Sequence, residues 1–582
     1  MTMTSERGVV TSTRETMTMT VGEFLLRRLR EAGVRHAFGL PGDYELELLQ
    51  QLQDTGTLEW VGTCNELNAS YAADGYGRLN GMAALILTYA VGPLSAINGI
   101  ACSYAEHVPV ICVCGSIPLR SAERRLDMHH TMADGTRDRF INAYAQVTAA
   151  QAKLTPRNAV TEIDRVIQTA WQEKLPVYIE LPSDIAYLDI EVPAAPLMLA
   201  DPPSDPERLQ SCAAAIADRL SQAKSPAILV DSDVDRFGAA GEVMGLAEKM
   251  QIPVAVAVTA KAVIDETFPH YLGLYNGKAG DPQVREAIEG SDCLLSIAYR
   301  PTDETSGGFT VSLPADTIHL RGYSADVGDD NFQAVTLKEV LRAVTGAVPQ
   351  VSNRAARRFT PAPAPGGNHA NGSDGSAKLT QAAYWQTIQG YIRPGDVILA
   401  DTSTSALGLH MPPNCTAVSQ VIWGSIGYGV GSLLGTLTAA PQRRHLLFVG
   451  DGSFQLTAQE VSTMLRHDYK PVIFLINNGG YTAERATLGK TAPFNDIANW
   501  AYANLPKTFR PDTTARSFVV KTVADLEKAL SAPNDTLIFI ESIMDPFDAP
   551  ASVINALNTG ADLIYGPRGP QHRGNMQIRQ AT

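Results

Sequence analysis

Short apolar runs alternate with segments of helical spacing along most of the chain. A buried strand of a parallel sheet is a short continuous apolar run, whereas a helix has apolar residues three and four positions apart. We predict helices that include 21–32, 97–105 and 453–468, and strands at 83–89, 108–113, 176–182, 225–230, 252–258, 396–400, 445–449 and 471–476. Strands that alternate with helices are typical of doubly wound parallel sheets. The pattern therefore predicts an α/β protein.

Segments that cannot form a core divide this pattern into three parts. Residues 1–17, rich in Thr, Ser and Met, and the polar residues 566–582 are expected to be disordered tails. Residues 194–206 are Pro-rich and linker-like, and residues 354–378 are full of Pro, Gly, Asn and Ser, which is typical of a linker. Three domains remain, each expected to hold a doubly wound parallel sheet: 18–190, 207–348 and 379–565.

Two of the predicted strands end in polar residues, and a predicted helix joins them. The first runs into Gly450, Asp451, Gly452 and Ser453, and the second into Asn477 and Asn478. Parallel strands joined by a helix end at the same edge of a sheet, where open α/β sheets bind ligands. The alternative is that the first segment is only a tight turn and the second only a loop.

The groups at this edge suit a metal ion and phosphate. The Asp451 carboxylate, the Asn478 amide oxygen and a backbone carbonyl near Gly480 are hard oxygen ligands, which Mg²⁺ prefers. The helix that begins near Ser453 points free N–H groups at the same place, which favours phosphate. We therefore predict a magnesium and diphosphate site here.

This arrangement, GDG followed by a strand ending in NN, resembles the thiamine diphosphate signature. The similarity extends from about residue 18 to 560 and is greatest to the 2-oxo acid decarboxylases, the pyruvate, indolepyruvate and phenylpyruvate decarboxylase group. The resemblance implies pyrimidine-binding, middle and diphosphate-binding domains in that order. It also implies that thiamine diphosphate and Mg²⁺ are the cofactors. The implied reaction is non-oxidative decarboxylation of a 2-oxo acid to an aldehyde and carbon dioxide.

Further cofactor contacts follow from the resemblance. Glu66, in NELNASYAADGYGR, matches the glutamate that bonds N1′ of the aminopyrimidine ring; by itself, a glutamate at a helix start is a dipole or capping partner. Gly424 matches the residue whose carbonyl meets the 4′-amino group. Ile426 matches the aliphatic residue wedged beneath the bent cofactor; the alternative for both is an ordinary turn and core.

Four residues are candidates for acid–base chemistry: Asp43, His129, His130 and Glu484. Paired imidazoles can move protons near neutral pH. The family has adjacent histidines after the strand that we predict at 108–113, and its YTxE motif matches YTAE at 481–484. From the residues alone, Asp43 could cap the helix at 44–52, the histidines could face solvent and Glu484 could be a surface residue. Which proton each residue moves stays open.

The resemblance also concerns assembly and substrate. It implies that Glu66 and the diphosphate loop come from different subunits, so that a homodimer is the smallest active unit and a homotetramer is expected. Ala406 and Ala483 are small where pyruvate-specific relatives have larger residues, which favours an aromatic or branched 2-oxo acid. Departures from the family at Ala90, Pro93, 132–135 and Ser403 bear on substrate identity more than on reaction type.

Composition excludes several other classes of protein. The net charge of −14, with no dense Lys/Arg tract in the 582 residues, argues against a nucleic-acid partner. No apolar run is long enough to span a membrane, and the N-terminus lacks the apolar core of a secretory signal. The seven scattered cysteines indicate reduced thiols in a cytoplasmic protein, and the Cys112–Cys114 pair has no partners spaced for a metal.

Three alternative functions remain. A thiamine diphosphate-dependent carboligase, of the acyloin or acetohydroxy acid synthase type, would use the same residues and differ only in product. A catalytically inactive paralogue would bind cofactor without turnover. A nicotinamide dehydrogenase is disfavoured because no predicted strand leads into GxGxxG. The middle domain also lacks a phosphate-binding glycine fingerprint, so we predict no flavin or nicotinamide there.

Overall fold

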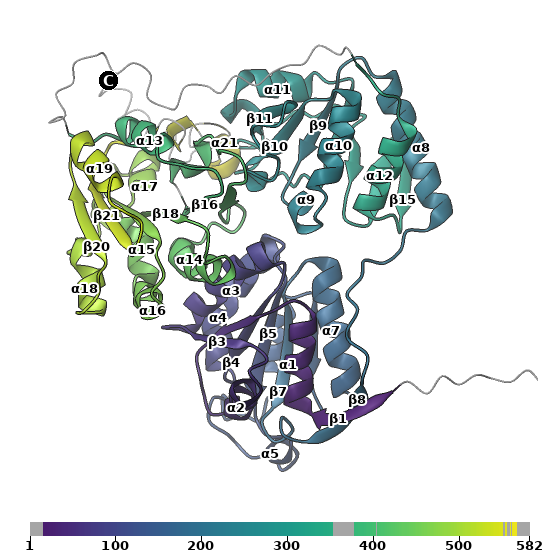
Figure 1. The fold of residues 1–582 in the computed structure, drawn as a ribbon, viewed down its shortest axis with the longest axis vertical. Coiled ribbons are helices and arrows are strands. Elements are labelled where there is room, and N and C mark those ends of the chain that lie inside the picture. The colour runs from purple at the N-terminus through teal and green to yellow at the C-terminus, as the bar shows by residue number, and fades with distance from the viewer. Residues whose placement is uncertain are drawn as a thin grey trace, which may run out of the picture.

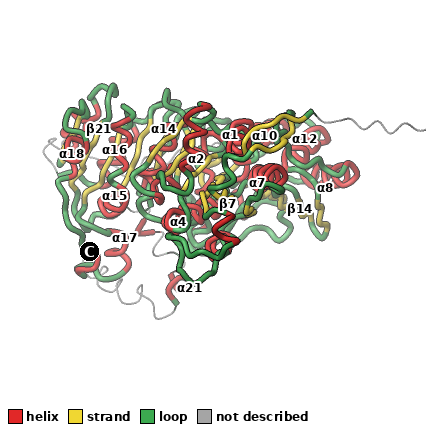
Figure 2. Tube along the Cα trace, turned by 90° about the horizontal axis from the view of Figure 1, so that it is seen from below, coloured by secondary structure: helices red, strands yellow, loops and turns green. Residues whose placement is uncertain are grey.

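The computed structural model describes residues 15–352, 378–402, 404–550, 553–555, 559 and 561–566. These residues form three α/β domains, which confirms the predicted fold class (Figure 1). In the view from below, the C-terminal domain and the middle domain lie at opposite ends, with helices α1, α2 and α7 of the N-terminal domain between them (Figure 2). Most of the predicted linker, most of both predicted tails and Ser403 lie outside the described residues. The domain limits drawn from the sequence stay predictions.

The N-terminal domain has a six-stranded parallel sheet in the order β3-β2-β4-β5-β7-β6. Its strands are β2 (His36–Gly39), β3 (Glu59–Gly62), β4 (Ala83–Leu87), β5 (Val110–Ser116), β6 (Ala150–Lys153) and β7 (Val177–Pro182). Its helices are α1 (Val21–Glu31), α2 (Leu46–Thr55), α3 (Glu66–Asn80), α4 (Val91–Ala105), α5 (Leu119–Glu123), α6 (Arg139–Tyr144) and α7 (Ala159–Glu173).

A separate antiparallel pair joins β1 (Thr16–Thr20) to β8 (Asp189–Pro193). Thr16 and Met17, which we predicted to be part of the disordered tail, therefore belong to a strand. Their register with Pro193 and Val192 fixes the start of the domain against its end. The prediction missed this strand because it is polar and half-exposed, so it carries no apolar run.

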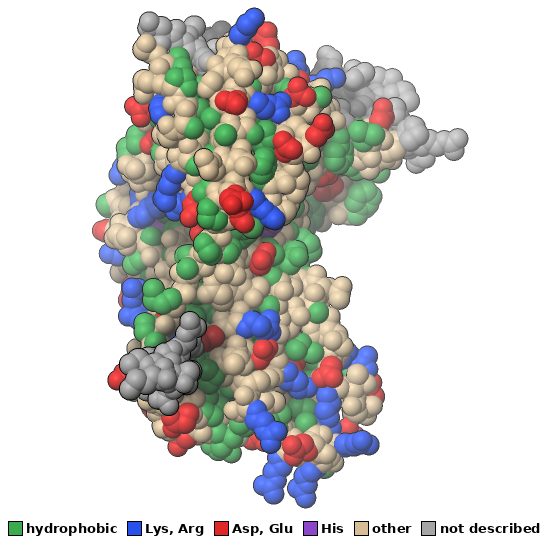
Figure 3. All heavy atoms as spheres, turned by 90° about the vertical axis from the view of Figure 1, so that its right-hand side faces the viewer, with side chains coloured by type: hydrophobic (Ala, Val, Ile, Leu, Met, Phe, Trp, Pro, Cys, Tyr) green, Lys and Arg blue, Asp and Glu red, His purple; other side chains and the backbone are tan. Residues whose placement is uncertain are grey.

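The middle domain has a seven-stranded sheet in the order β11-β10-β9-β12-β13-β14-β15. Its strands are β9 (Pro226–Val230), β10 (Val254–Ala257), β11 (Tyr271–Tyr275), β12 (Cys293–Ile297), β13 (Ile318–Leu320), β14 (Ser324–Val327) and β15 (Asp330–Gln333), and its helices are α8 (Pro206–Gln222), α9 (Asp233–Arg236), α10 (Ala240–Met250), α11 (Pro282–Glu289) and α12 (Leu337–Ala347). The pairs β13–β14 and β14–β15 are antiparallel, whereas the other strands of this sheet pair in parallel, so the sheet is mostly parallel. On the face in Figure 3, charges of both signs are interspersed over this domain, and Lys and Arg side chains gather at the lower end of the molecule.

The C-terminal domain has a fully parallel sheet in the order β17-β16-β18-β19-β21-β20. Its strands are β16 (Val397–Ala400), β17 (Thr416–Val418), β18 (His445–Gly450), β19 (Val472–Asn477), β20 (Arg516–Val520) and β21 (Ile538–Ile543). Its helices are α13 (Gln381–Gln389), α14 (Tyr428–Ala439), α15 (Asp451–Thr457), α16 (Glu460–Arg466), α17 (Thr482–Thr487), α18 (Leu505–Phe509), α19 (Val523–Leu530) and α21 (Ala561–Tyr565). The two central strands are buried almost throughout because helices cover both faces.

The predicted helix 453–468 differs from the structure. It begins two residues earlier, at Asp451, and divides into α15 and α16 at Ala458 and Gln459. Both residues keep helical backbone angles, but the next hydrogen bonds, from the N–H groups of Val461 and Ser462, reach only three residues back. Periodicity could not show this break, because apolar spacing is preserved across a short tightening of a helix.

Helices α3 and α14 join the N-terminal and C-terminal domains along a line of small residues. A Cβ atom at Gly435 would lie 1.8 Å from the carbonyl oxygen of Ala72, and one at Gly75 would lie 2.3 Å from that of Ser432. Tyr428 adds a hydroxyl that donates to buried Asp74 at 2.6 Å. One apolar core therefore runs through both domains, and it fixes the C-terminal sheet edge relative to the start of α3.

Candidate active site

A cavity of about 380 Å³ opens at the carboxyl edge of the C-terminal sheet. Its lining comes entirely from the C-terminal domain: Gln381, Trp385, Thr402, Thr404, Ser405, Gly424, Ile426, Gly450, Asp451, Gly452, Ser453, Ile476, Asn478, Gly480, Tyr481, Thr482, Ala483, Glu484, Ala549, Pro550 and Val553. All nine residues that we predicted in this domain as cofactor, metal or catalytic residues lie on its wall. The edge therefore gathers the predicted residues as the strand order requires.

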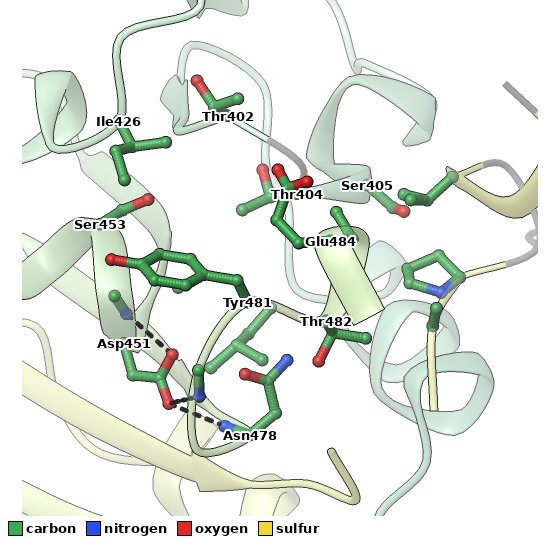
Figure 4. A pocket seen from close by; sticks show the side chains of 18 of the residues that line it. Thr402, Thr404, Ser405, Ile426, Asp451, Ser453, Asn478, Tyr481, Thr482 and Glu484 are labelled. Carbon is green, nitrogen blue, oxygen red and sulfur yellow. Dashed lines mark hydrogen bonds between the residues drawn. The ribbon is translucent and has the colours of Figure 1, made fainter. Parts of the chain in front are cut away.

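Asp451 is held by backbone N–H groups (Figure 4). Its Oδ2 accepts from the N–H groups of Asn478, Gly479 and Gly480 at 3.2, 2.7 and 3.1 Å, and its Oδ1 accepts from Gly452 at 2.8 Å. Burial raises the pKa of this carboxyl, and the four N–H groups pull it back only in part. A bound cation would offset the cost of keeping this buried carboxylate charged.

The two asparagines at the end of β19 differ. The Asn477 amide donates to Glu541 at 2.8 Å and to Asn499 at 3.1 Å, so it ties the strand to its neighbours. In contrast, Oδ1 of Asn478 is buried on the cavity wall and has no hydrogen-bond partner among the described residues. A buried acceptor without a partner calls for a ligand. The residues present therefore fit a cation held between Asp451 and Asn478.

The loop after β19 is rigid. Gly480 has a positive φ of 134°, and a Cβ atom there would lie 2.1 Å from the carbonyl oxygen of Asn495, so only glycine fits. The buried Arg485 guanidinium donates to the carbonyl oxygens of Asn478 at 3.3 Å and Gly479 at 2.7 Å. These bonds turn the loop so that its N–H groups face Asp451.

Asp401 is buried behind the cavity wall that Thr402 and Ser453 line. Its carboxylate accepts from the N–H groups of Thr402 at 2.8 Å and Gly429 at 2.7 Å. Burial raises its pKa to about 6, while these N–H groups and the Ser453 hydroxyl lower it. The acid thus links the start of α14 to the start of α15. Gly424, with a positive φ of 66°, and Ile426 line the cavity beside it.

Glu484 lies on α17 and extends into the cavity toward Thr404 (Figure 4). Ala483, the residue before it, also lines the cavity. Ala406 does not: it belongs to η3 (Ser405–Gly408) and is fully buried in the core, and its neighbour Ser405 contributes to the wall instead. The structure therefore removes Ala406 from the residues that we expected to set substrate size.

Asp43, His129 and His130 form a separate cluster on the N-terminal domain. Oδ2 of Asp43 lies 2.8 Å from Nε2 of His129. The Tyr44 ring stacks on the His129 ring at 4.9 Å, and its hydroxyl donates to the His129 carbonyl at 3.1 Å. Glu45, not Asp43, occupies the cap position of α2, which leaves the Asp43 carboxylate to His129. Nδ1 of His130 is buried without a partner among the described residues.

Glu66 is the first residue of α3 and lies in neither group. Asn65 caps this helix by accepting from the N–H of Asn68 at 2.8 Å. Glu460 of α16 then accepts from the Asn68 amide at 2.7 Å, which holds the start of α3 against the C-terminal domain. The structure therefore places the predicted residues in three groups within one chain, and the predicted cofactor residues of the two domains do not line a common cavity.

Sequence reasoning missed several residues of the site. Asp401 could have been found, because it directly follows an apolar strand at the same sheet edge. Arg485 is a charged residue just after the loop that follows β19, and by sequence it resembles a surface residue. Gln381 and Trp385 come from α13, which shows no polar cluster, so only the folded structure brings them to the cavity.

Comparisons with known proteins match all three domains. Residues 19–138 match the thiamine pyrophosphate enzyme N-terminal TPP binding domain, residues 213–347 the central domain and residues 402–540 the C-terminal TPP binding domain. The chain is 38% identical over 539 residues to the alpha-keto-acid decarboxylase of Mycobacterium tuberculosis, which covers 91% of this chain and 95% of the relative. It is 36% identical over 563 residues to the pyruvate decarboxylase of Candida glabrata, covering 94% and 99%, respectively.

Proposed function

Because this chain belongs to the thiamine pyrophosphate enzyme family and is a thiamine diphosphate-dependent 2-oxo acid decarboxylase, we propose that Mg²⁺ and the cofactor's diphosphate bind in the C-terminal cavity. We also propose that the substrate is an aromatic or branched 2-oxo acid. The products are an aldehyde and carbon dioxide. The unpartnered Oδ1 of Asn478, buried beside Asp451, is the observation that carries the proposal.

The donor set supports Mg²⁺. Asp451 supplies a carboxylate oxygen, Asn478 an amide oxygen and Gly480 a backbone carbonyl, which together with diphosphate oxygens suit a hard divalent cation. Gly450, Gly452 and Ser453 stand at the start of α15 and face the same cavity, so the N–H groups there would meet the diphosphate.

When bound, thiamine diphosphate supplies a thiazolium ring that accepts the electron pair left when carbon dioxide departs. We assign to Glu66 the proton at N1′ of the aminopyrimidine and to Gly424 the carbonyl that orients the 4′-amino group. Ile426 would support the bent shape of the cofactor from below. Asp43, His129, His130 and Glu484 would deliver and remove protons at the reacting carbon.

We propose that two subunits bring these groups together. One chain keeps Asp43, His129 and Glu66 away from its own cavity, as described above. Exposed apolar side chains on α4, Val91 and Leu94, lie on a helix that also binds Trp423 through Asn98 at 2.8 Å. An apolar face on the helix that contacts Trp423, close in sequence to Gly424 and Ile426, suits a second copy of this chain. We therefore propose a homodimer as the smallest active unit and a homotetramer as the full assembly.

No described helix has the length and apolarity to cross a membrane. All seven cysteines are free thiols, which supports the proposed cytoplasmic location.

The substrate class is tested by turnover of pyruvate, a branched oxo acid, phenylpyruvate and indolepyruvate with thiamine diphosphate and Mg²⁺. We expect aldehyde in step with carbon dioxide, fastest with the bulky substrates. Ala483→Ile should lower kcat/KM for phenylpyruvate relative to pyruvate about tenfold or more, because it fills the cavity beside Glu484. Ala406→Val, in the core, is the matched control and should leave the preference unchanged. Acyloin as the main product would assign the enzyme to the carboligases instead.

A further inference from the structure

Glu45 is a buried acid two residues after Asp43. Only 1% of its surface is exposed. It stands at the cap position of α2 but makes no capping bond to that helix. Its side chain turns back instead, and Oε1 accepts from the N–H of Gly42 at 2.5 Å. The carboxylate thus closes the turn from which Asp43 extends.

The turn has little room to move on the sheet beneath it. A Cβ atom at Gly42 would lie 2.4 Å from Cβ of Thr88, just beyond β4. A Cβ atom at Gly115 in β5 would lie 2.6 Å from the backbone of Tyr44 and 2.7 Å from Cβ of Glu45. The backbone of residues 42–45 is therefore pressed against the ends of two strands, and the bond between Gly42 and Glu45 fixes its shape.

The three consecutive residues of this turn all serve the same histidine. Asp43 contacts Nε2 of His129 at 2.8 Å, and Tyr44 stacks on its ring and binds its carbonyl. Glu45 lies below both and holds the backbone that carries them. A shift of the turn would therefore change the distance from Asp43 to His129 directly.

We infer that Glu45 is a positioning residue for decarboxylation: by accepting the Gly42 N–H it holds Asp43 against His129, and its protonation releases this alignment. The inference rests on the proposed acid–base role of Asp43 and His129. Glu45 itself does not line the cavity and is not assigned contact with substrate or cofactor.

The surroundings of Glu45 allow it to titrate in the working range. Burial raises its pKa to about 7, and the neighbouring Asp43 carboxylate adds to the rise, whereas the Gly42 N–H and Thr88 hydroxyl lower it. Cys114 of β5 faces it with a thiol whose own pKa burial raises, and beyond that thiol lies Glu180 of β7. A charged carboxylate is a stronger acceptor than a neutral one, so the bond to Gly42 weakens as pH falls below about 7.

The test compares kcat and KM of the holoenzyme across about pH 5.5 to 8.5, where general acid–base groups near neutrality are resolved. Glu45→Gln keeps the shape and an acceptor oxygen but cannot ionise. We expect an ionisation near pH 7 on the acidic limb of the wild-type kcat profile and its absence in this variant. Glu45→Ala should lower kcat at pH 8 by about tenfold or more with little change in cofactor affinity, because a small misplacement of a catalytic group is costly.

Two further variants separate the possible failures. Glu180→Gln removes a buried acid of the same sheet whose pKa burial raises to about 7, but which does not contact the turn, and it should keep the wild-type profile. Asp43→Asn should lower kcat strongly; full activity there would overturn the proposed acid–base set itself. If Asp43→Asn is impaired but Glu45→Gln keeps the wild-type ionisation, or Glu180→Gln abolishes it, the positioning role of Glu45 is wrong.

Discussion

The adjacent asparagines at the end of β19 are the same residue type, but their surroundings suit one to a structural role and the other to ligand binding. Asn477 has two hydrogen-bond partners, and Asn478 has an orphaned oxygen. The sequence predicted Asn478 as the ligand from its place at the end of a strand, beside the predicted Asp451 site. Residue type alone does not distinguish it from Asn477, because the two residues are identical and adjacent. The alternation of side chains along a strand is what sends them to different sides.

Asn478→Ala should weaken binding of Mg²⁺ and thiamine diphosphate by about tenfold or more while leaving the melting temperature of the cofactor-free enzyme unchanged. Asn477→Ala should instead lower the melting temperature of the cofactor-free enzyme and leave the binding of Mg²⁺ and thiamine diphosphate nearly unchanged. It leaves the buried Glu541 carboxylate short of a donor, which costs about 1–3 kcal/mol of stability. Calorimetric titration and scanning calorimetry on both variants give the two readings. Equal loss of stability in the two variants would contradict the assignment.

Glu45 also makes stability depend on pH. Its folded-state pKa of about 7 lies above the usual value for an exposed glutamate, so the folded state holds its proton more tightly. The stability linked to this proton is fully present below about pH 4.5 and is lost as pH rises to about 7. The loss amounts to about 3 kcal/mol.

Glu45→Gln has no such loss. Its melting temperature relative to wild type should therefore rise between pH 5 and pH 8, even if the variant is less active. Scanning calorimetry of the cofactor-free proteins at both pH values is the measurement. A difference between the two proteins that stays constant over this range would show that Glu45 ionises normally.

At the scale of elements, the line of contact between α3 and α14 depends on glycine. The segment after Glu66 is rich in small residues, a composition that favours close packing against another helix. The sequence could not identify the partner helix, which lies far along the chain. Strands at the sheet edges were similarly less predictable than central ones: β18 and β19 are continuous apolar runs, whereas β14 and β15 are polar and short.

Gly435→Ala should destabilise the protein by about 3 kcal/mol or more, because the new methyl group would overlap the Ala72 carbonyl and force the helices apart. Gly245→Ala is the matched control. Gly245 is an exposed glycine within α10 with nothing within 4 Å of the added atom, and the change should stabilise by about 0.5–1 kcal/mol. Comparable melting temperatures for the two variants would contradict the packing described here.

At the scale of the whole molecule, the predicted site is separated into groups on two domains. The cavity could be predicted from the sequence because its residues follow neighbouring parallel strands. The relation of Asp43, His129 and Glu66 to that cavity could not, since it depends on how domains and subunits meet rather than on any local pattern.

A mixture of two inactive variants tests this relation. Glu66→Gln removes the proposed pyrimidine contact, and Asp451→Asn removes a proposed metal ligand. If the two residues serve one site from different subunits, equal mixing after dissociation should restore about a quarter of wild-type activity, because half of the dimers then carry one intact site. Mixtures that remain inactive, although exchange of labelled subunits is complete, would place both residues in the same subunit's site.

The contact between α3 and α14 also has a consequence for synthesis on the ribosome. Helix α3 emerges from the ribosome early, but α14, which covers it, begins about 350 residues later. At ordinary elongation rates this leaves an interval on the order of tens of seconds. During that time the nascent N-terminal domain exposes the face of α3 that packs against α14 in the folded protein, because α14 has not yet been synthesised. Newly made chains should therefore depend on chaperones until translation is nearly complete.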